Sequence, residues 1–151
     1  FFRPPILCPH SSAQYVEKWI TYANDYIAAK ELTVLPGQTV VVKDAAAYGC
    51  ITLQGHGRLG VYEVEAACML RYGQLSADEY FVSEPAARAG VKITNASRWE
   101  PLVMLKHFAN NNPETPKTVP GPKKAAQGGT PEAFVAFPRR GVAWRRPPRG
   151  A

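Results

Sequence analysis

The chain has 151 residues, enough for one domain with a hydrophobic core and too few for two domains of ordinary size. Its net charge is +6, but residues 117–151 hold eight Lys and Arg against one acidic residue, whereas residues 1–116 hold ten against eleven. The basic charge that would suggest a nucleic-acid-binding protein therefore belongs to the C-terminal segment. No run of about eighteen apolar residues indicates a membrane span.

The cysteines favour a reducing compartment. Cys8, Cys50 and Cys68 are odd in number and widely spaced, so we expect neither a disulfide framework nor a zinc knuckle. The first ten residues, FFRPPILCPH, lack the pattern of a secretory signal. We therefore expect a cytoplasmic protein with reduced thiols, in which Cys50 is a core residue.

The first elements in chain order are a mixture of clear and ambiguous patterns. Residues 11–31 favour a short helix or turn through Trp19, followed by extended chain. The segment LTVLPGQTVVVKD predicts two strands joined by a Pro-Gly turn, because residues 39–43 are rich in β-branched side chains. The segment GCITLQGHGRLGV predicts two strands around a hairpin at Gly55-His56-Gly57, since glycine adopts positive φ readily.

The second half of the chain continues the strand pattern and then changes character. Further strands are predicted at residues 80–82, 91–94 and 101–108. Seven or so short strands without long intervening helices indicate an all-β sandwich or barrel. From Asn110 onward the chain is rich in Pro, Gly and basic residues, and it cannot bury enough apolar surface to offset its ordering entropy. We expect a largely disordered C-terminal tail.

Four segments carry a resemblance to the cupin superfamily. They are LTVLPGQTVVVKD, GCITLQGHGRLGV, GQLSADEYFVSEPAARAGVKITNAS and EPLVMLKHF, and in this order they resemble the strands of the C-terminal cupin of mannose-6-phosphate-isomerase-like proteins. The resemblance implies a cupin jelly-roll β-barrel, commonly dimeric, often with a sugar or small-acid site and a metal ion. It divides the chain into an N-terminal arm (1–14), a cupin domain (15–113) and a basic tail (114–151).

The metal motifs of that family can be matched position by position. Aligning the last glycine of the first motif with Gly55 places its glutamate at Tyr48 and its two histidines near Val41 and Lys43. The second motif places a further histidine at Val91. Valine has no donor atom, lysine is protonated at neutral pH and tyrosine is an uncommon zinc ligand. The sequence therefore predicts a cupin domain without a metal cofactor.

His56 leaves one alternative open. Gln54 and His56 are two residues apart and share a face of an extended strand, and a Gln-x-His pair also occurs in the zinc site of true mannose-6-phosphate isomerases. Together with Glu63 and Glu65, which also share a strand face, they could hold zinc or another divalent metal for aldose–ketose isomerisation. The favoured interpretation is a solvent-exposed turn histidine and an exposed acidic face.

The other histidines are expected to be structural. Strand alternation puts His107 on the face opposite Lys106 and Phe108, where we expect it to be half-buried, and His10 is expected in a loop. The sequence contains no glycine-rich phosphate loop and no Ser/His/Asp elbow.

A metal-free barrel would bind its ligand through other side chains. Lys43 and Tyr48 are expected to line the cavity and to hydrogen-bond a small polar molecule. Arg88 and Lys92 suit a sugar phosphate or a carboxylate, because Arg offers a planar fork and Lys a point charge, although a surface role fits them equally. We therefore predict a non-catalytic sugar-binding or dimerisation domain, as a homodimer or packed on another cupin domain. The alternatives are a metal-dependent sugar-phosphate isomerase and, less favoured, a nucleic-acid-associated protein acting through its tail.

Overall fold

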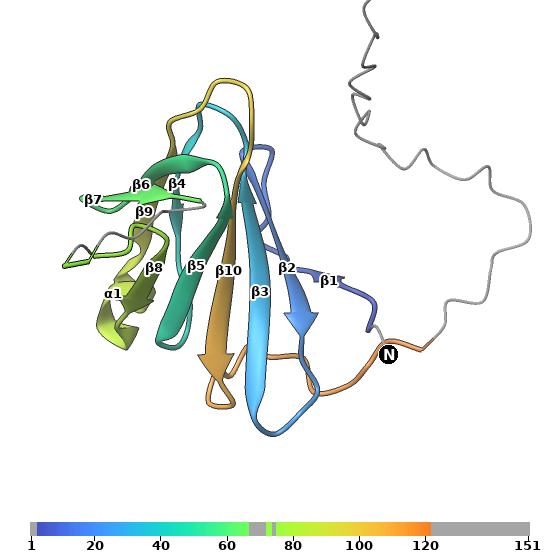
Figure 1. The fold of residues 1–151 in the computed structure, drawn as a ribbon. Helices are drawn as coiled ribbons and strands as arrows, with labels where there is room; N and C mark the ends of the chain where they lie inside the picture. The colour runs from blue at the N-terminus through green and yellow to red at the C-terminus, as the bar shows by residue number, and fades with distance from the viewer. Residues whose placement is uncertain (1–2, 67–71, 74, 122–151) are drawn as a thin grey trace, which may run out of the picture. The chain divides into compact units, whose positions relative to one another are not determined.

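The computed structural model describes residues 3–66, 72–73 and 75–121. These residues form two antiparallel sheets, with strand orders β1-β2-β3-β10-β5-β8 and β4-β9-β6-β7 (Figure 1). The elements in chain order are β1 (Ile6–Leu7), β2 (Tyr15–Thr21), β3 (Ile27–Val34), β4 (Thr39–Val42), β5 (Tyr48–Gln54), β6 (His56–Leu59), β7 (Tyr62–Glu65), β8 (Glu79–Val82), α1 (Glu84–Ala89), β9 (Val91–Asn95) and β10 (Leu102–Ala109). The all-β fold predicted from the sequence is confirmed.

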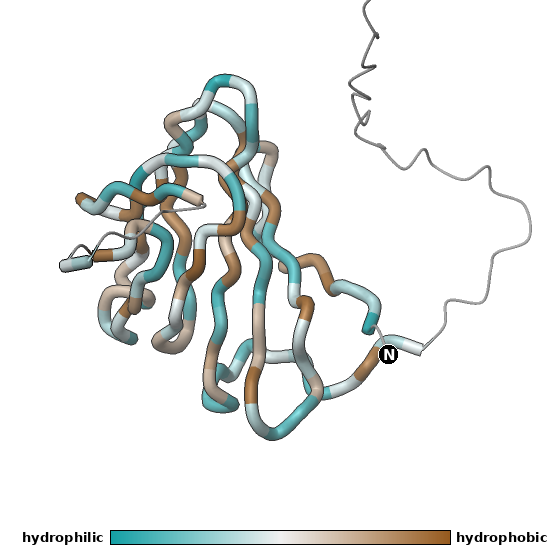
Figure 2. Tube along the Cα trace, in the orientation of Figure 1, coloured by the Kyte–Doolittle hydropathy of each residue, from teal (hydrophilic) through white to brown (hydrophobic). Residues whose placement is uncertain are grey.

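The hydrophobic core lies between the two sheets, because every second side chain of a strand points to the same face. Along β10 the buried residues are Leu102, Met104, Lys106 and Phe108, and the residues between them are more exposed. Hydrophilic residues accordingly interrupt the hydrophobic ones along these strands (Figure 2). Of the described residues, no helix has the length and hydrophobicity needed to cross a membrane.

The helix considered for residues 11–31 is wrong. Residues 15–21 form β2, which pairs antiparallel with β3. The turn alternative agrees only with residues 11–14, which are irregular, and not with the remainder up to Trp19. The segment forms a strand because Glu17 and Trp19, two residues apart, are both buried on one face. A helix would not place residues two apart on the same face.

The hairpin predicted at Gly55-His56-Gly57 is also wrong. β5 belongs to the six-stranded sheet and β6 to the four-stranded sheet, so the chain passes from one layer to the other at Gly55, whose φ is +84°. A Cβ atom on Gly57 would overlap the carbonyl oxygen of Thr94 on β9, so this glycine allows the close approach of two backbones. The tight hairpin follows at residues 60–61, between β6 and β7.

Segments near both ends of the described chain pack against the rest of the domain. β1 pairs with β2, so the predicted N-terminal arm extends the six-stranded sheet. After β10, the Pro116 carbonyl accepts a hydrogen bond of 3.0 Å from the Ala23 amide, and Thr115 is buried. The predicted disordered tail thus begins too early, because residues 114–116 at its start contact the domain. The part of that tail beyond residue 121, and the expected thiol at Cys68, lie outside the described residues.

Candidate functional site

Four charged side chains meet in the interior, between the two sheets. Glu17 of β2, Lys30 of β3 and Lys106 of β10 are each 0% exposed, and Asp44, which follows β4, is 3% exposed. Strand alternation places the three strand residues there. Lys106 lies between the buried Met104 and Phe108, and Glu17 and Lys30 occupy inward positions on β2 and β3.

The four groups form a closed ring of ion pairs. Lys30 Nζ donates a hydrogen bond of 2.7 Å to Asp44 Oδ1 and lies 3.3 Å from Glu17 Oε2. Lys106 Nζ donates a hydrogen bond of 2.6 Å to Asp44 Oδ2 and also contacts Glu17 Oε1. Each carboxylate therefore bridges both ammonium groups, and the two positive and two negative charges balance. We call these four residues the ion network.

Aromatic rings surround the ammonium groups. Lys30 Nζ lies 4.7 Å from the centroid of the Trp19 ring and 5.5 Å from that of Phe108. Lys106 Nζ lies 5.1 Å from the Tyr48 ring. A cation over an aromatic face is attracted by the electron density of the ring, and this attraction is stronger away from water. The rings therefore stabilise the two lysines as cations.

Two further side chains connect the ion network to solvent. His10 Nε2 lies 2.6 Å from Glu17 Oε2 with 38% of its side chain exposed, and Glu114 Oε2 lies 3.3 Å from Lys30 Nζ with 45% exposed. The irregular segment that carries His10 is itself fixed to β2, because the Ser11 hydroxyl donates to the Glu17 carbonyl and accepts from the Glu17 amide. His10 lies in a turn, as expected.

The ion network favours the charged forms of Glu17 and Lys30. Burial alone would raise the pKa of Glu17, but Lys106 and Lys30 outweigh burial and lower it below the usual value. Burial alone would lower the pKa of Lys30, but Glu17 and Asp44 outweigh it and raise that pKa above the usual value. Burial and then the Asp44 carboxylate raise the pKa of Tyr48, so its phenol stays protonated.

The interior donor set does not fit the metal ion that the cupin resemblance implies. Among the described residues, one trio of potential ligands, Cys8, His10 and Glu17, places its ligand atoms within 4.8 Å of one another. Glu17 already contacts the ammonium groups of Lys30 and Lys106, which would repel a divalent cation. Burial and then Glu17 raise the pKa of Cys8 to about 11, whereas a metal binds the thiolate.

The structure separates Tyr48 from Lys43, Arg88 and Lys92, the other residues predicted to bind a small molecule. Tyr48 points into the interior and is 1% exposed, and its hydroxyl has no hydrogen-bond partner among the described residues. Lys43 and Lys92 are exposed, and Arg88 is exposed on α1, where its Nε donates to Glu84 Oε1 at 2.8 Å. Ligand binding by these residues stays a prediction.

The residues of the zinc alternative lie on the outer surface. His56 begins β6, directly opposite Glu65 of β7, and its side chain is 53% exposed. Glu63 is engaged by Arg58 at 2.7 Å, and Gln54 is exposed at the end of β5. A metal site made of these four residues would therefore lie outside the barrel.

Sequence reasoning did not find the ion network. The signal was available, because the alternation that places His107 opposite Lys106 and Phe108 also places Lys106 inside. That opposite placement of His107 is confirmed, but the expectation that it is half-buried is wrong, since it is exposed and its ring lies over Gly49. Cys50 is buried in the core, as expected, and burial raises its pKa to about 12.

Comparison with known proteins gives a likeness of fold. No family model matches the sequence, and no curated protein is similar to it. The polyketide cyclase RemF from Streptomyces resistomycificus superposes with a TM-score of 0.51 and 10% identity, over 74% of this chain and 76% of that chain. An RmlC-like cupin protein from Ralstonia eutropha gives a TM-score of 0.49 and 12% identity, over 71% of this chain and 63% of that chain. A cupin-2 domain from Rhodospirillum rubrum gives a TM-score of 0.45 and 18% identity, over 80% of this chain and 76% of that chain.

The likeness to RemF agrees with the two antiparallel sheets. The chain is an all-β protein built from these two sheets. The match spans less than two thirds of the Ralstonia eutropha protein, and at these identities the likeness concerns the fold alone.

Proposed function

We propose that this chain is a metal-free, non-catalytic cupin-like domain whose barrel interior is structural. The observation that carries the proposal is the Asp44 carboxylate, which accepts hydrogen bonds from both Lys30 and Lys106. Two ammonium groups thus occupy the interior, where they neutralise the carboxylates that a divalent cation would need. The interior supplies charge balance to the fold, and both of the buried carboxylates that the structure describes, Glu17 and Asp44, are already paired with ammonium groups.

The state of Lys30 also argues against chemistry by this residue in the interior. A lysine that acts as nucleophile or general base needs a pKa lowered towards neutrality and access to its substrate. Lys30 is fully buried, and its pKa is raised above the ordinary value by its carboxylate partners. The proposal therefore excludes Lys30 as a Schiff-base or general-base residue.

The proposal is tested by measuring aldose–ketose interconversion with mannose 6-phosphate. The full chain is assayed alone and with added zinc, and the His56→Ala variant is assayed in parallel. We expect no turnover in any sample. Zinc-dependent turnover that His56→Ala abolishes would replace the proposal by the isomerase alternative, with its site on the outer surface at residues 54–65.

Dimerisation is a second candidate function, favoured by apolar side chains on the outer face of the six-stranded sheet. Phe81 of the edge strand β8 is 76% exposed, and Leu53 of β5 is 53% exposed. Ile51 and Leu105 lie opposite each other in register on the same face. An exposed apolar edge strand is a template for pairing with a second copy around a two-fold axis.

The dimer is tested by sedimentation analysis of the full chain. We expect a dimer at micromolar concentration, and a monomer in Phe81→Glu. The matched control is Trp99→Glu, which changes a 90% exposed aromatic residue in the loop between β9 and β10. A wild-type monomer, or equal dissociation by both substitutions, would remove this candidate.

The proposed compartment is the cytoplasm. Cys8 and Cys50 are free thiols, which supports a reducing environment. Nucleic-acid binding through the basic segment 117–151 is the less favoured alternative.

A further inference from the structure

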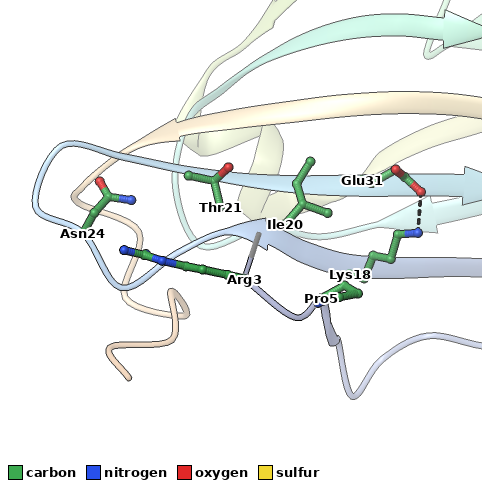
Figure 3. Close-up of a pocket in the computed structure, with 7 residues that line it drawn as sticks. All are labelled: Arg3, Pro5, Lys18, Ile20, Thr21, Asn24 and Glu31. Atoms are coloured by element: carbon green, nitrogen blue, oxygen red, sulfur yellow. Dashed lines mark ion pairs between the residues drawn. The ribbon is translucent and has the colours of Figure 1, made fainter. Parts of the chain in front are cut away.

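A hollow of about 450 Å³ lies at the β1–β2 edge of the six-stranded sheet (Figure 3), and the residues that line it do not belong to the ion network. Its volume is within the range of small-molecule sites. Figure 3 shows Arg3 lying along the hollow with its guanidinium directed towards Asn24, and the Lys18–Glu31 ion pair at the other end. The lining residues are Arg3, Pro5, Lys18, Ile20, Thr21, Asn24 and Glu31.

The segment that carries Arg3 is held against the sheet. The Tyr22 hydroxyl donates a hydrogen bond of 2.5 Å to the Pro4 carbonyl, and β1 continues the attachment by pairing with β2. The Arg3 Cζ atom lies 5.9 Å from the centroid of the buried Tyr22 ring. Arg3 is therefore positioned by the fold and is partly buried.

The charges that line the hollow do not balance. Lys18 Nζ and Glu31 Oε1 are 2.7 Å apart, so these two residues neutralise each other. Arg3 has no carboxylate partner within the part of the chain that the structure describes, and the lining carries one net positive charge. A partly buried guanidinium without a counter-ion is a site for an anion.

The polar groups beside Arg3 are donors. The Asn24 side-chain oxygen accepts hydrogen bonds from the backbone amides of Tyr26 at 3.0 Å and Ile27 at 2.9 Å, so it serves the turn and the Asn24 NH₂ group remains available. The Thr21 hydroxyl can also donate. The hollow therefore offers donors, while its single carboxylate is already paired.

We propose that this hollow binds a small organic anion through its phosphate or carboxylate group. Arg3 forms bidentate hydrogen bonds with the oxyanion, the Asn24 amide and the Thr21 hydroxyl complete its coordination, and Pro5 and Ile20 contact the carbon skeleton. This inference goes beyond the proposed function, because none of these residues belongs to the ion network or to the dimer face.

The test is titration calorimetry of the full chain with four probes: mannose 6-phosphate, mannose, inorganic phosphate and gluconate. We expect mannose 6-phosphate or gluconate to bind and mannose not to bind, and the better of the two anions identifies the oxyanion. Arg3→Gln should weaken binding by about tenfold or more. The matched control Arg98→Gln removes the same charge from an exposed loop and should bind as the wild type does. This pair also controls for anions bound by the basic segment 117–151.

A second variant tests the anion site while keeping the turn that the Asn24 side-chain oxygen stabilises. Asn24→Asp keeps the side-chain oxygen that accepts from Tyr26 and Ile27 but adds a negative charge, so it should abolish binding with an unchanged melting temperature. Equal affinity of the wild type, Arg3→Gln and Asn24→Asp would overturn the proposal, as would the absence of binding for every anionic probe. Loss of binding in Arg88→Gln but not in Arg3→Gln would place the anion at α1 and overturn it as well.

Discussion

Lys30 of β3 and Lys106 of β10 lie directly opposite each other in register, and both side chains are completely buried. Like charges opposed across neighbouring strands destabilise a sheet, and buried charges without partners destabilise it far more. Asp44 accepts from both ammonium groups, and Glu17 contacts both. The lysine pair is therefore compatible with the fold only while both carboxylate side chains are present.

Removal of one carboxylate should strongly destabilise the fold. Glu17→Gln leaves two buried ammonium groups with one buried carboxylate, and we expect it to lower the free energy of unfolding by about 3–5 kcal/mol. The matched control is Glu63→Gln, which breaks the exposed ion pair with Arg58 and should cost less than about 1 kcal/mol. Urea unfolding measures both. Equal unfolding midpoints would contradict the ion network as described.

Replacement of the whole ion network should be less damaging than the single substitutions suggest. The four-residue variant Glu17→Met, Lys30→Met, Asp44→Leu and Lys106→Met removes every buried charge at once and leaves none unpaired. We expect its loss of unfolding free energy to be smaller than the sum for the four single variants, because directly interacting residues are not additive. Additive losses would show that the four groups do not act together.

Stability should depend on pH at both extremes. The pKa of Glu17 is lower in the folded chain than its ordinary value of 4.5, so its contribution is present above pH 4.5 and is lost as pH falls through the folded pKa. The pKa of Lys30 is raised above its ordinary value of 10.5, so its contribution is present below pH 10.5 and is lost as pH rises through the folded pKa. Melting temperatures across the pH range should show a plateau between these limits. A Glu17→Gln variant that retains the full acid-side slope would contradict this assignment.

Two glycines should differ in their tolerance of a methyl group. A Cβ on Gly57 meets the Thr94 carbonyl, part of the β9 backbone, so Gly57→Ala should cost about 1–3 kcal/mol or more. A Cβ on Gly49 meets the ring of His107, which is a movable side chain. The cost of Gly49→Ala should therefore fall when His107→Ala is also present. Chemical unfolding of the single and double variants measures this, and an unchanged cost for Gly49→Ala would show that the His107 ring is not the obstacle.

The strands could be predicted from the sequence where hydrophobic alternation is strong. The predicted segments 91–94 and 101–108 correspond to β9 and β10. The step between layers at Gly55 could not be predicted, because a glycine pair next to strands indicates a hairpin and the change of sheet depends on partners distant in sequence. The strand β2 was obscured because its inner face carries Glu17 as well as Trp19.

The candidate site also depends on residues that are distant in sequence. Tyr48 was predicted to face the interior from the cupin resemblance, and the structure places it there. Lys30 and Lys106 were not predicted to be buried. Lysine is almost never fully buried, so an isolated lysine in a strand is expected to face solvent. Only the tertiary fold brings Asp44 and Glu17 to them, from elements separated along the chain.

The central claim is that ammonium groups, rather than a metal ion, balance the carboxylates of the barrel interior. The most direct measurement is elemental analysis of the full chain purified without a histidine tag, before and after treatment with a chelator, together with its melting temperature. We expect substoichiometric metal in both samples and an unchanged melting temperature. One tightly held zinc, iron, nickel or manganese per chain, with a fall in melting temperature on its removal, would contradict the account.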